Sequence, residues 1–145
     1  MPGFSHTAVV DAPPARVYAH LADPRSYVGL SPLVVTVRDV RSVDAGVAYV
    51  AVERFRLGPL HWDNPIRVTM AGEPDRSLAS TVVSPGRVHL TATVTLAPAG
   101  GGTSVTEHIE IQAPWFLRRF AAGQARKVQR YRLAELGRRM AAAGQ

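Results

Sequence analysis

The sequence contains no cysteine and no long apolar run. Without cysteine, disulfides, zinc–thiolate sites and cysteine nucleophiles are all excluded. No apolar stretch approaches the roughly 20 residues that a helix needs to span a bilayer, so no such helix is predicted. The segment Met1 to His6 lacks a basic region followed by an apolar run, and we expect no secretory signal. These absences favour a cytoplasmic protein.

Recognisable catalytic and cofactor motifs are also missing. The chain has no Gly-x-Ser-x-Gly elbow, no P-loop and no dinucleotide fingerprint. The glycines at 100–102 precede a predicted strand and not a helix, so they indicate a hairpin tip and not a phosphate cradle. No two histidines have the spacing of metal ligands. The five are His6, His20, His61, His89 and His108. We therefore expect neither a metal nor a cofactor.

The net charge of +6 is concentrated near the C-terminus. From Pro114 to Gln145 there are eight basic residues and one acid, whereas the remainder of the chain is close to neutral. At helical spacing, most of the basic side chains share one face. They are Arg119, Arg126, Lys127, Arg130 and Arg138. This face offers charge without stacking or base-reading groups, which argues against a nucleic-acid partner and favours a solvated surface.

The segment Trp115 to Phe120 mixes aromatic residues with arginines at the start of the predicted helix. One interpretation is that rings pack beneath the helix while the arginines stay in water. The other is a transient contact of this segment with an anionic membrane surface.

The order of predicted elements indicates one α+β domain over residues 1–145. Phe4 to Val10 is predicted as a strand, and Pro14 and Pro24 each follow a helix-start signal. Six further strands follow, joined by hairpin-length turns that favour antiparallel pairing. They are Leu33 to Val43, Val47 to Leu57, Leu60 to Ala71, Leu78 to Val83, Val88 to Ala97 and Thr103 to Ala113. A helical period of nearly 30 residues then starts at Pro114. We predict a curved seven-stranded sheet wrapped around this helix, with two short helices after the first strand.

Alternation along the strands separates an inward face from an outward one. In the strand from Leu60 the even positions face inward, and in the strand from Val88 the apolar positions alternate with threonines. The strand from Leu78 is ambiguous. We predict an inner wall that surrounds an apolar cavity. Its residues are Tyr49, Phe55, Trp62, Ile66, Met70, Leu90, Val94 and Ile109, with Glu53, Asn64 and Glu107 as polar contacts.

Three charged residues fall on predicted inward positions. They are Glu53 and Glu107 on strands and Arg132 on the helix. A buried carboxylate without a partner is costly, so one interpretation is a structural ion pair or a position at the rim. The other is that one or both carboxylates bind the polar end of a ligand, where a carboxyl of raised pKa could act as a general acid or base.

The chain resembles the START-like SRPBCC superfamily of helix-grip proteins. The resemblance lies in Asp11 to Pro24, in the Ser84-Pro85-Gly86 turn, and in Gly101 to Glu107 running into Pro114 and the long helix. It covers nearly the whole chain. It implies an internal cavity for lipids, polyketides, sterols or similar molecules, and it includes both carriers and polyketide cyclases, aromatases or dehydratases.

Three functional hypotheses follow. The first is the binding or carrying of a hydrophobic small molecule, such as a lipid or polyketide. The second is a metal-free enzyme of the polyketide cyclase, aromatase or dehydratase type, with Glu53 or Glu107 as the catalytic candidate. The third is a peripheral membrane or interaction protein that uses the basic C-terminal helix.

Overall fold

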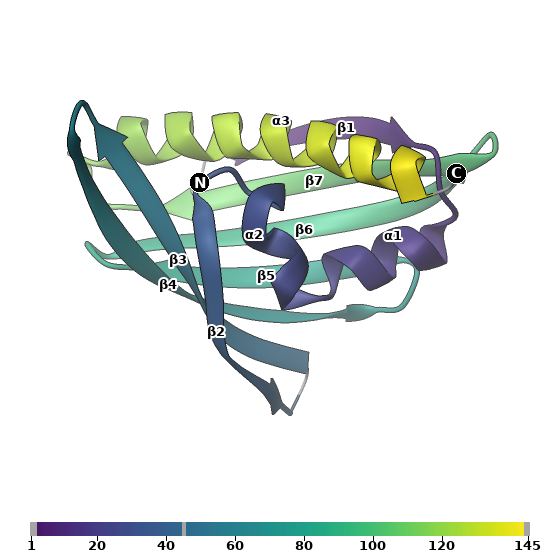
Figure 1. Ribbon diagram of the computed structural model, residues 1–145, viewed down its shortest axis with the longest axis horizontal. Coiled ribbons are helices and arrows are strands. Elements are labelled where there is room, and N and C mark those ends of the chain that lie inside the picture. Colours follow the sequence, from purple (N-terminus) through teal and green to yellow (C-terminus); the bar gives the residue numbers. More distant parts are fainter. Residues whose placement is uncertain (1–2, 45, 144–145) are drawn as a thin grey trace.

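The fold is a curved antiparallel sheet with a long helix across its concave face (Figure 1). The computed structural model describes residues 3–44 and 46–143. The strands are β1 (Gly3–Val10), β2 (Val34–Val43), β3 (Gly46–Leu57), β4 (Leu60–Glu73), β5 (Ser77–Ser84), β6 (Val88–Ala99) and β7 (Gly102–Gln112). The helices are α1 (Pro14–Leu21), the 3₁₀ turn η1 (Pro24–Ser26), α2 (Tyr27–Leu30) and α3 (Arg118–Ala143). The seven strands lie in the order β1-β7-β6-β5-β4-β3-β2. The predicted α+β helix-grip fold is therefore confirmed.

One helix boundary differs from the predicted one. Whereas α1 begins at Pro14, in agreement with its predicted start, the start of the long helix is shifted. The long helix α3 begins at Arg118 and not at Pro114, because the preceding residues form a turn in which the Leu117 amide donates to the Pro114 carbonyl. With 26 residues, α3 is about 39 Å long and still crosses the sheet.

The predicted turns are present at their expected positions. Gly86, which follows Pro85, has a φ of +84°, the left-handed conformation that the Pro-Gly pair predicts. The predicted turn at residues 44–46 includes Ala45, which lies outside the described residues.

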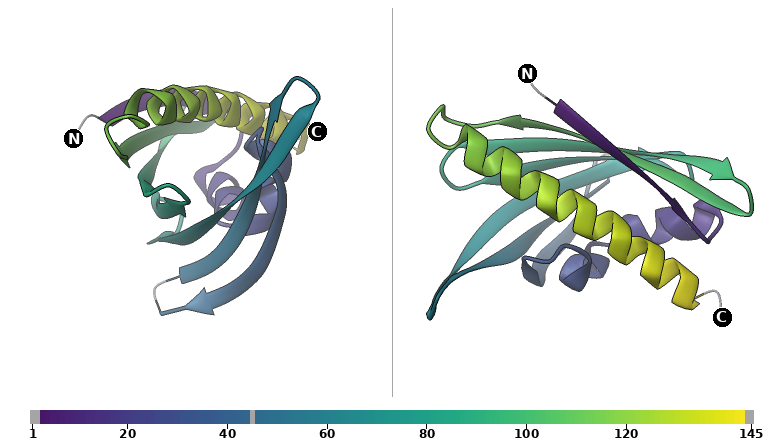
Figure 2. Two further views of the ribbon diagram at one scale, coloured as in Figure 1. Left: turned by 90° about the vertical axis from the view of Figure 1, so that its left-hand side faces the viewer. Right: turned by 90° about the horizontal axis from the view of Figure 1, so that it is seen from above.

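The short helices cover only one end of the concave face. Figure 1 shows α1 and α2 below the C-terminal half of α3, and Figure 2 shows α3 running across the sheet above them. Val17 and Leu21 of α1 and Leu30 of α2 are buried in one apolar cluster with Leu133, Leu136 and Met140 of α3. The N-terminal half of α3 has no such helices beneath it.

The hairpin of β3 and β4 extends beyond the rest of the sheet. Pairing of β4 with β5 begins at Arg67 with Val83, so among the described strands residues 60–66 pair with β3 alone. Pro65 lies in this stretch, where its missing amide hydrogen removes no bond to β5. Leu60 and Trp62, both predicted to face the interior, are 67% and 51% exposed because nothing covers the projecting tip.

Elsewhere, the predicted alternation agrees with the observed burial. On β4, Ile66, Val68 and Met70 are buried, and on β7, Val105, Glu107, Ile109 and Ile111 are buried. The ambiguous strand β5 directs Leu78, Ser80, Val82 and Ser84 inward, since these alternate with exposed positions. No helix in the described part of the chain is long and apolar enough to cross a membrane.

Candidate ligand-binding cavity

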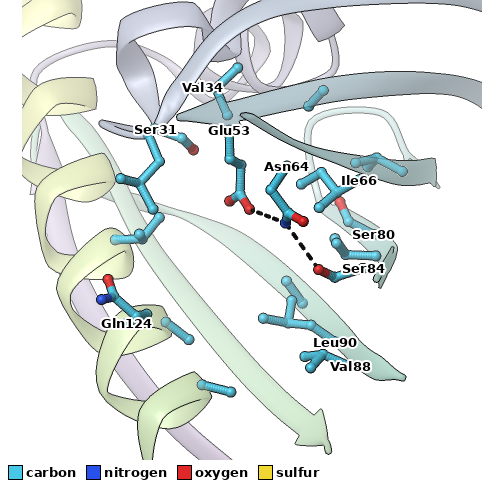
Figure 3. Close-up of a pocket in the computed structure, with 18 of the residues that line it drawn as sticks. Ser31, Val34, Glu53, Asn64, Ile66, Ser80, Ser84, Val88, Leu90 and Gln124 are labelled. Carbon is cyan, nitrogen blue, oxygen red and sulfur yellow. Dashed lines mark hydrogen bonds between the residues drawn. The ribbon is translucent and has the colours of Figure 1, made fainter. Parts of the chain in front are cut away.

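A cavity of about 360 Å³ lies between the inner face of the sheet and α3. Its volume lies in the range of small-molecule pockets, roughly 300 to 1,000 Å³. Strands β3 to β7 supply most of the wall, and residues between Leu117 and Arg132 supply the opposite side. Figure 3 shows Gln124 of α3 facing the sheet side chains across this space.

Most of the predicted wall lines this cavity. The residues are Tyr49, Phe55, Trp62, Ile66, Leu90, Val94 and Ile109, together with the polar Glu53, Asn64 and Glu107. The structure thus places them around one space, and their contact with a ligand stays a prediction.

Met70 is the exception among the predicted residues. It points inward from β4 and is 2% exposed, but it does not line the cavity. Instead, it belongs to the packed cluster that includes Val17 and Leu21 of α1. The alternation of β4 gave its face correctly, whereas its distance along the strand places it where α1 fills the concave surface.

Glu107 and Arg132 form a buried ion pair at one wall. The Nη2 of Arg132 lies 2.6 Å from Oε1 of Glu107, and their side chains are 13% and 5% exposed. Arg132 also donates from Nη1 to the Ser31 hydroxyl at 3.0 Å, and Gln129 donates to the Glu107 carbonyl. Burial, the largest single influence, lowers the pKa of Arg132, but the Glu107 carboxylate together with Tyr27 and Tyr49 raises it, and the net shift is upward, so the guanidinium stays charged. Of the two interpretations above, Glu107 fits the structural ion pair.

Glu53 has different surroundings. The amide nitrogen of Asn64 donates to Oε1 of Glu53 at 3.4 Å and to the hydroxyl of Ser84 at 3.2 Å (Figure 3). Within the described part of the chain, no basic side chain lies at ion-pair distance from Glu53. Burial raises the pKa of Glu53, while the Asn64 hydrogen bond and the more distant charge of Arg132 lower it by less. The net effect favours the neutral carboxylic acid.

Two tyrosines add uncharged polar groups to the wall. Tyr27 and Tyr49 both line the cavity, with ring centroids 6.5 Å apart. The Tyr27 hydroxyl donates to the Leu21 carbonyl at 2.6 Å. Burial raises the pKa of both phenols, so they remain neutral.

The mouth of the cavity carries exposed aromatic side chains. Trp62 and Phe120 line the cavity and are nevertheless 51% and 59% exposed, which places them at its opening. Trp115 and Phe116 lie beside Phe120 in sequence and are 81% and 66% exposed. The prediction that rings pack beneath the helix is wrong for Trp115 and Phe116, because α3 starts later and leaves both in an exposed turn. Phe120, in the first turn of α3, is also mostly exposed although it lines the cavity.

Sequence reasoning missed several residues of the wall. Those with polar side chains are Tyr27, Ser31, Ser80, Ser84 and Gln124, and Val82 and Val88 are apolar additions. The ambiguous alternation of β5 concealed its serines. The signal that could have found Ser84 is the Pro85-Gly86 turn, which fixes where β5 ends. Among residues 3–44 and 46–143, no three His, Asp or Glu side chains are grouped in a way that could hold a metal ion.

Comparison with known families decides the classification. A family model described as polyketide cyclase / dehydrase and lipid transport matches residues 1–141. The chain belongs to this polyketide cyclase / dehydrase and lipid transport family. The resemblance to the SRPBCC superfamily is thereby confirmed. The family description covers both enzymes and lipid carriers, so membership supports a hydrophobic ligand and leaves the reaction open. No curated protein matches the sequence.

Solved structures share the fold of this family member at low identity. The protein XoxI from Bacillus cereus is 12% identical with a TM-score of 0.74, and the match covers 100% of this chain and 99% of XoxI. A conserved protein from Geobacillus kaustophilus is 14% identical with a TM-score of 0.72, and 98% of this chain covers 97% of it. The di-domain aromatase/cyclase BexL from the BE-7585A biosynthetic pathway is 17% identical with a TM-score of 0.71. There, 96% of this chain covers 50% of BexL. At these identities the likeness establishes the fold alone.

Proposed function

We propose that residues 1–141 of this chain, the span of the family match, act as one domain that binds an apolar small molecule in the cavity beneath α3. The observation that carries the proposal is an open, mostly apolar space of about 360 Å³ in a fold that could have filled it with side chains. Protein interiors are otherwise packed to near crystal density, and unfilled apolar volume costs stability. A ligand that occupies the space recovers that contact energy.

The test is binding of an uncharged fluorescent probe, N-phenyl-1-naphthylamine, together with native mass spectrometry of the protein from its own host. Saturable fluorescence enhancement and a co-purifying lipid-sized mass are expected. Narrowing the cavity with Ala92→Phe, an inward position on β6, should abolish the enhancement without unfolding the sheet. The matched control Thr93→Phe points outward from the same strand and should bind as the wild type does. A wild-type protein that gives no saturable binding overturns the proposal.

The same proposal includes loading and release at an anionic membrane surface. Phe120 exposes an apolar ring at the mouth, Trp115 and Phe116 expose theirs just before it in the chain, and the neighbouring Arg118 and Arg119 are exposed cations. Aromatic rings beside arginines suit the interfacial region of an anionic bilayer. Co-sedimentation with vesicles that contain phosphatidylglycerol tests this contact.

A second candidate function is catalysis in the same cavity, and the surroundings of Glu53 favour it. Burial raises the pKa of the Glu53 carboxyl, and a protonated carboxyl beside an apolar ligand can donate a proton to a carbonyl or hydroxyl oxygen. The cyclase and dehydrase reactions of the family description involve proton transfer of this kind. Turnover of a polyketide-like substrate that is lost in Glu53→Gln, with binding retained, would support this candidate.

A further inference from the structure

A row of three polar side chains crosses one wall of the otherwise apolar cavity. Glu53 of β3 and Asn64 of β4 are directly paired in the sheet register, and Ser84 ends β5 beside them. We call these three residues the polar row. All three line the cavity, and Figure 3 shows them joined by the two hydrogen bonds of the Asn64 amide nitrogen.

The hydrogen bonds within the polar row leave a definite set of groups for a ligand. Asn64 uses its amide nitrogen on both neighbours, so its carbonyl oxygen is free to accept. Ser84 accepts from Asn64 and therefore keeps its own hydroxyl hydrogen to donate. Neutral Glu53 also has a hydroxyl hydrogen. The row thus offers two donors and one acceptor, and none of the three carries a charge when Glu53 is protonated.

The charges near the row are already neutralised. Arg132 of α3 is the cation whose field reaches Glu53, and it is bound to the Glu107 carboxylate of β7 and to Ser31. Tyr49 of β3 and Tyr27 of α2 are neutral phenols. A ligand carboxylate at the row would therefore be buried without a free cation, which is costly.

We propose that the polar row recognises an uncharged oxygen, a ketone carbonyl or a hydroxyl, on an otherwise apolar ligand, and discriminates against a carboxylate. This inference rests on the proposed binding function and adds the chemical class of the ligand. A ketone oxygen accepts from Ser84 and Glu53, and a hydroxyl can in addition donate to the Asn64 carbonyl. An ionised fatty acid finds no free countercharge at the row.

The experiment compares ligands of equal chain length in displacement of N-phenyl-1-naphthylamine. The four are 2-dodecanone, 1-dodecanol, dodecane and dodecanoate. At neutral pH the ketone and the alcohol are expected to bind at least about tenfold more tightly than dodecanoate, because one neutral hydrogen bond and an avoided buried charge act together. Dodecane should lie between the oxygenated ligands and dodecanoate.

Two variants test whether the polar row causes the preference for the ketone. Ser84→Ala and Glu53→Leu should each bring the ketone closer to dodecane, by about three- to tenfold. Thr81→Ala removes a hydroxyl from the exposed face of β5, outside the cavity, and its ketone-to-dodecane ratio should match the wild type. Glu53→Gln keeps a donor without titrating. The wild-type preference for the ketone should decline as the pH rises through the raised pKa of Glu53, whereas the Glu53→Gln ratio should stay flat.

The outcomes separate the two proposals. If the wild type does not bind the probe, the binding function itself fails. If the probe binds but dodecanoate competes as well as the ketone, or Ser84→Ala and Glu53→Leu leave the ratios unchanged, the cavity binds ligands and only the polar-row inference is overturned.

Discussion

At the scale of single residues, the buried ion pair of Glu107 and Arg132 is the contact whose loss should affect stability most. Both side chains are nearly inaccessible to water, and each supplies the other's principal charged contact at 2.6 Å. Such a pair need not stabilise the fold relative to apolar residues, yet removing one partner leaves an uncompensated buried charge.

We predict that Glu107→Gln lowers the free energy of unfolding by about 3 to 5 kcal/mol, because Arg132 then stays charged without a counterion. Urea denaturation followed by circular dichroism measures the change. Glu110→Gln is the matched control on the same strand, since Glu110 is exposed and its loss should cost less than about 0.5 kcal/mol. Equal losses in the two variants would show that the pair contributes nothing beyond surface charge.

The sequence located these residues but not their roles. The alternation on β7 and the apolar arc of the helix correctly predicted that Glu107 and Arg132 face inward. No sequence pattern, however, predicts that two residues 25 positions apart form a contact. The alternation led to the same interpretation for Glu53 and Glu107. In the structure, Glu107 pairs with Arg132, whereas no described basic side chain forms an ion pair with Glu53. Met70 was wrongly placed in the cavity wall, because the alternation of a strand predicts which face a side chain points to but not which part of that face the cavity covers.

At the scale of elements, Arg139 ties the end of α3 to the short helices. Its Nη1 donates to the Ser26 carbonyl at 2.7 Å and lies 3.2 Å from Nε2 of His20, and its Nη2 donates to the Val28 carbonyl at 3.1 Å. The segment so held includes Tyr27 and leads to Ser31, both of which line the cavity. Arg139 therefore couples α3 to one wall of the cavity.

We predict that Arg139→Ala lowers the free energy of unfolding by about 1 to 3 kcal/mol, because the part-buried Ser26 carbonyl and the Val28 carbonyl lose a charged donor. Amide hydrogen exchange should accelerate locally in residues 24–31. Arg138→Ala is the control on the preceding residue: Arg138 is exposed and contacts Glu135 of its own helix, so its loss should leave the free energy of unfolding almost unchanged. Exchange in residues 24–31 that is equal in both variants would contradict the role of Arg139.

The elements themselves were largely predictable. Every strand was found within about two residues, since turns at Gly and Pro bound each apolar run. The start of α3 was missed because Trp115, Phe116 and Leu117 fit a helical period and an exposed turn equally well. The projecting β3–β4 hairpin was missed because a strand segment paired on one side has the same alternation as one paired on both sides; Pro65 was its one local signal.

At the scale of the whole molecule, the fold divides the concave face into a packed end and a hollow end. The helices α1 and α2 fill the end beneath the C-terminal half of α3, and the cavity occupies the other end. The order of elements predicted the wrapping of the sheet around α3. It could not predict the hollow, because the size of a cavity depends on how far each helix reaches along the sheet.

The two tryptophans of the chain lie at the mouth or close to it in sequence. Trp62 lines the cavity, and the exposed Trp115 comes two residues before Leu117, which also lines it. Their fluorescence therefore reports directly on the surface that we propose to contact an anionic membrane. Transfer of an indole from water to the lipid interface shifts its emission to shorter wavelength.

We predict a blue shift with phosphatidylcholine vesicles that contain phosphatidylglycerol, and a much smaller shift with phosphatidylcholine alone, because the mouth is flanked by exposed arginines. Added salt should weaken the effect. Arg118→Glu combined with Arg119→Glu should abolish it, whereas Lys127→Glu combined with Arg130→Glu, which makes the same charge change farther along α3, should retain it. If the second pair abolishes the shift and the first does not, the middle of α3 and not the mouth meets the membrane. If no vesicle shifts the emission even at low salt, ligand must enter this cavity from solution or from another protein.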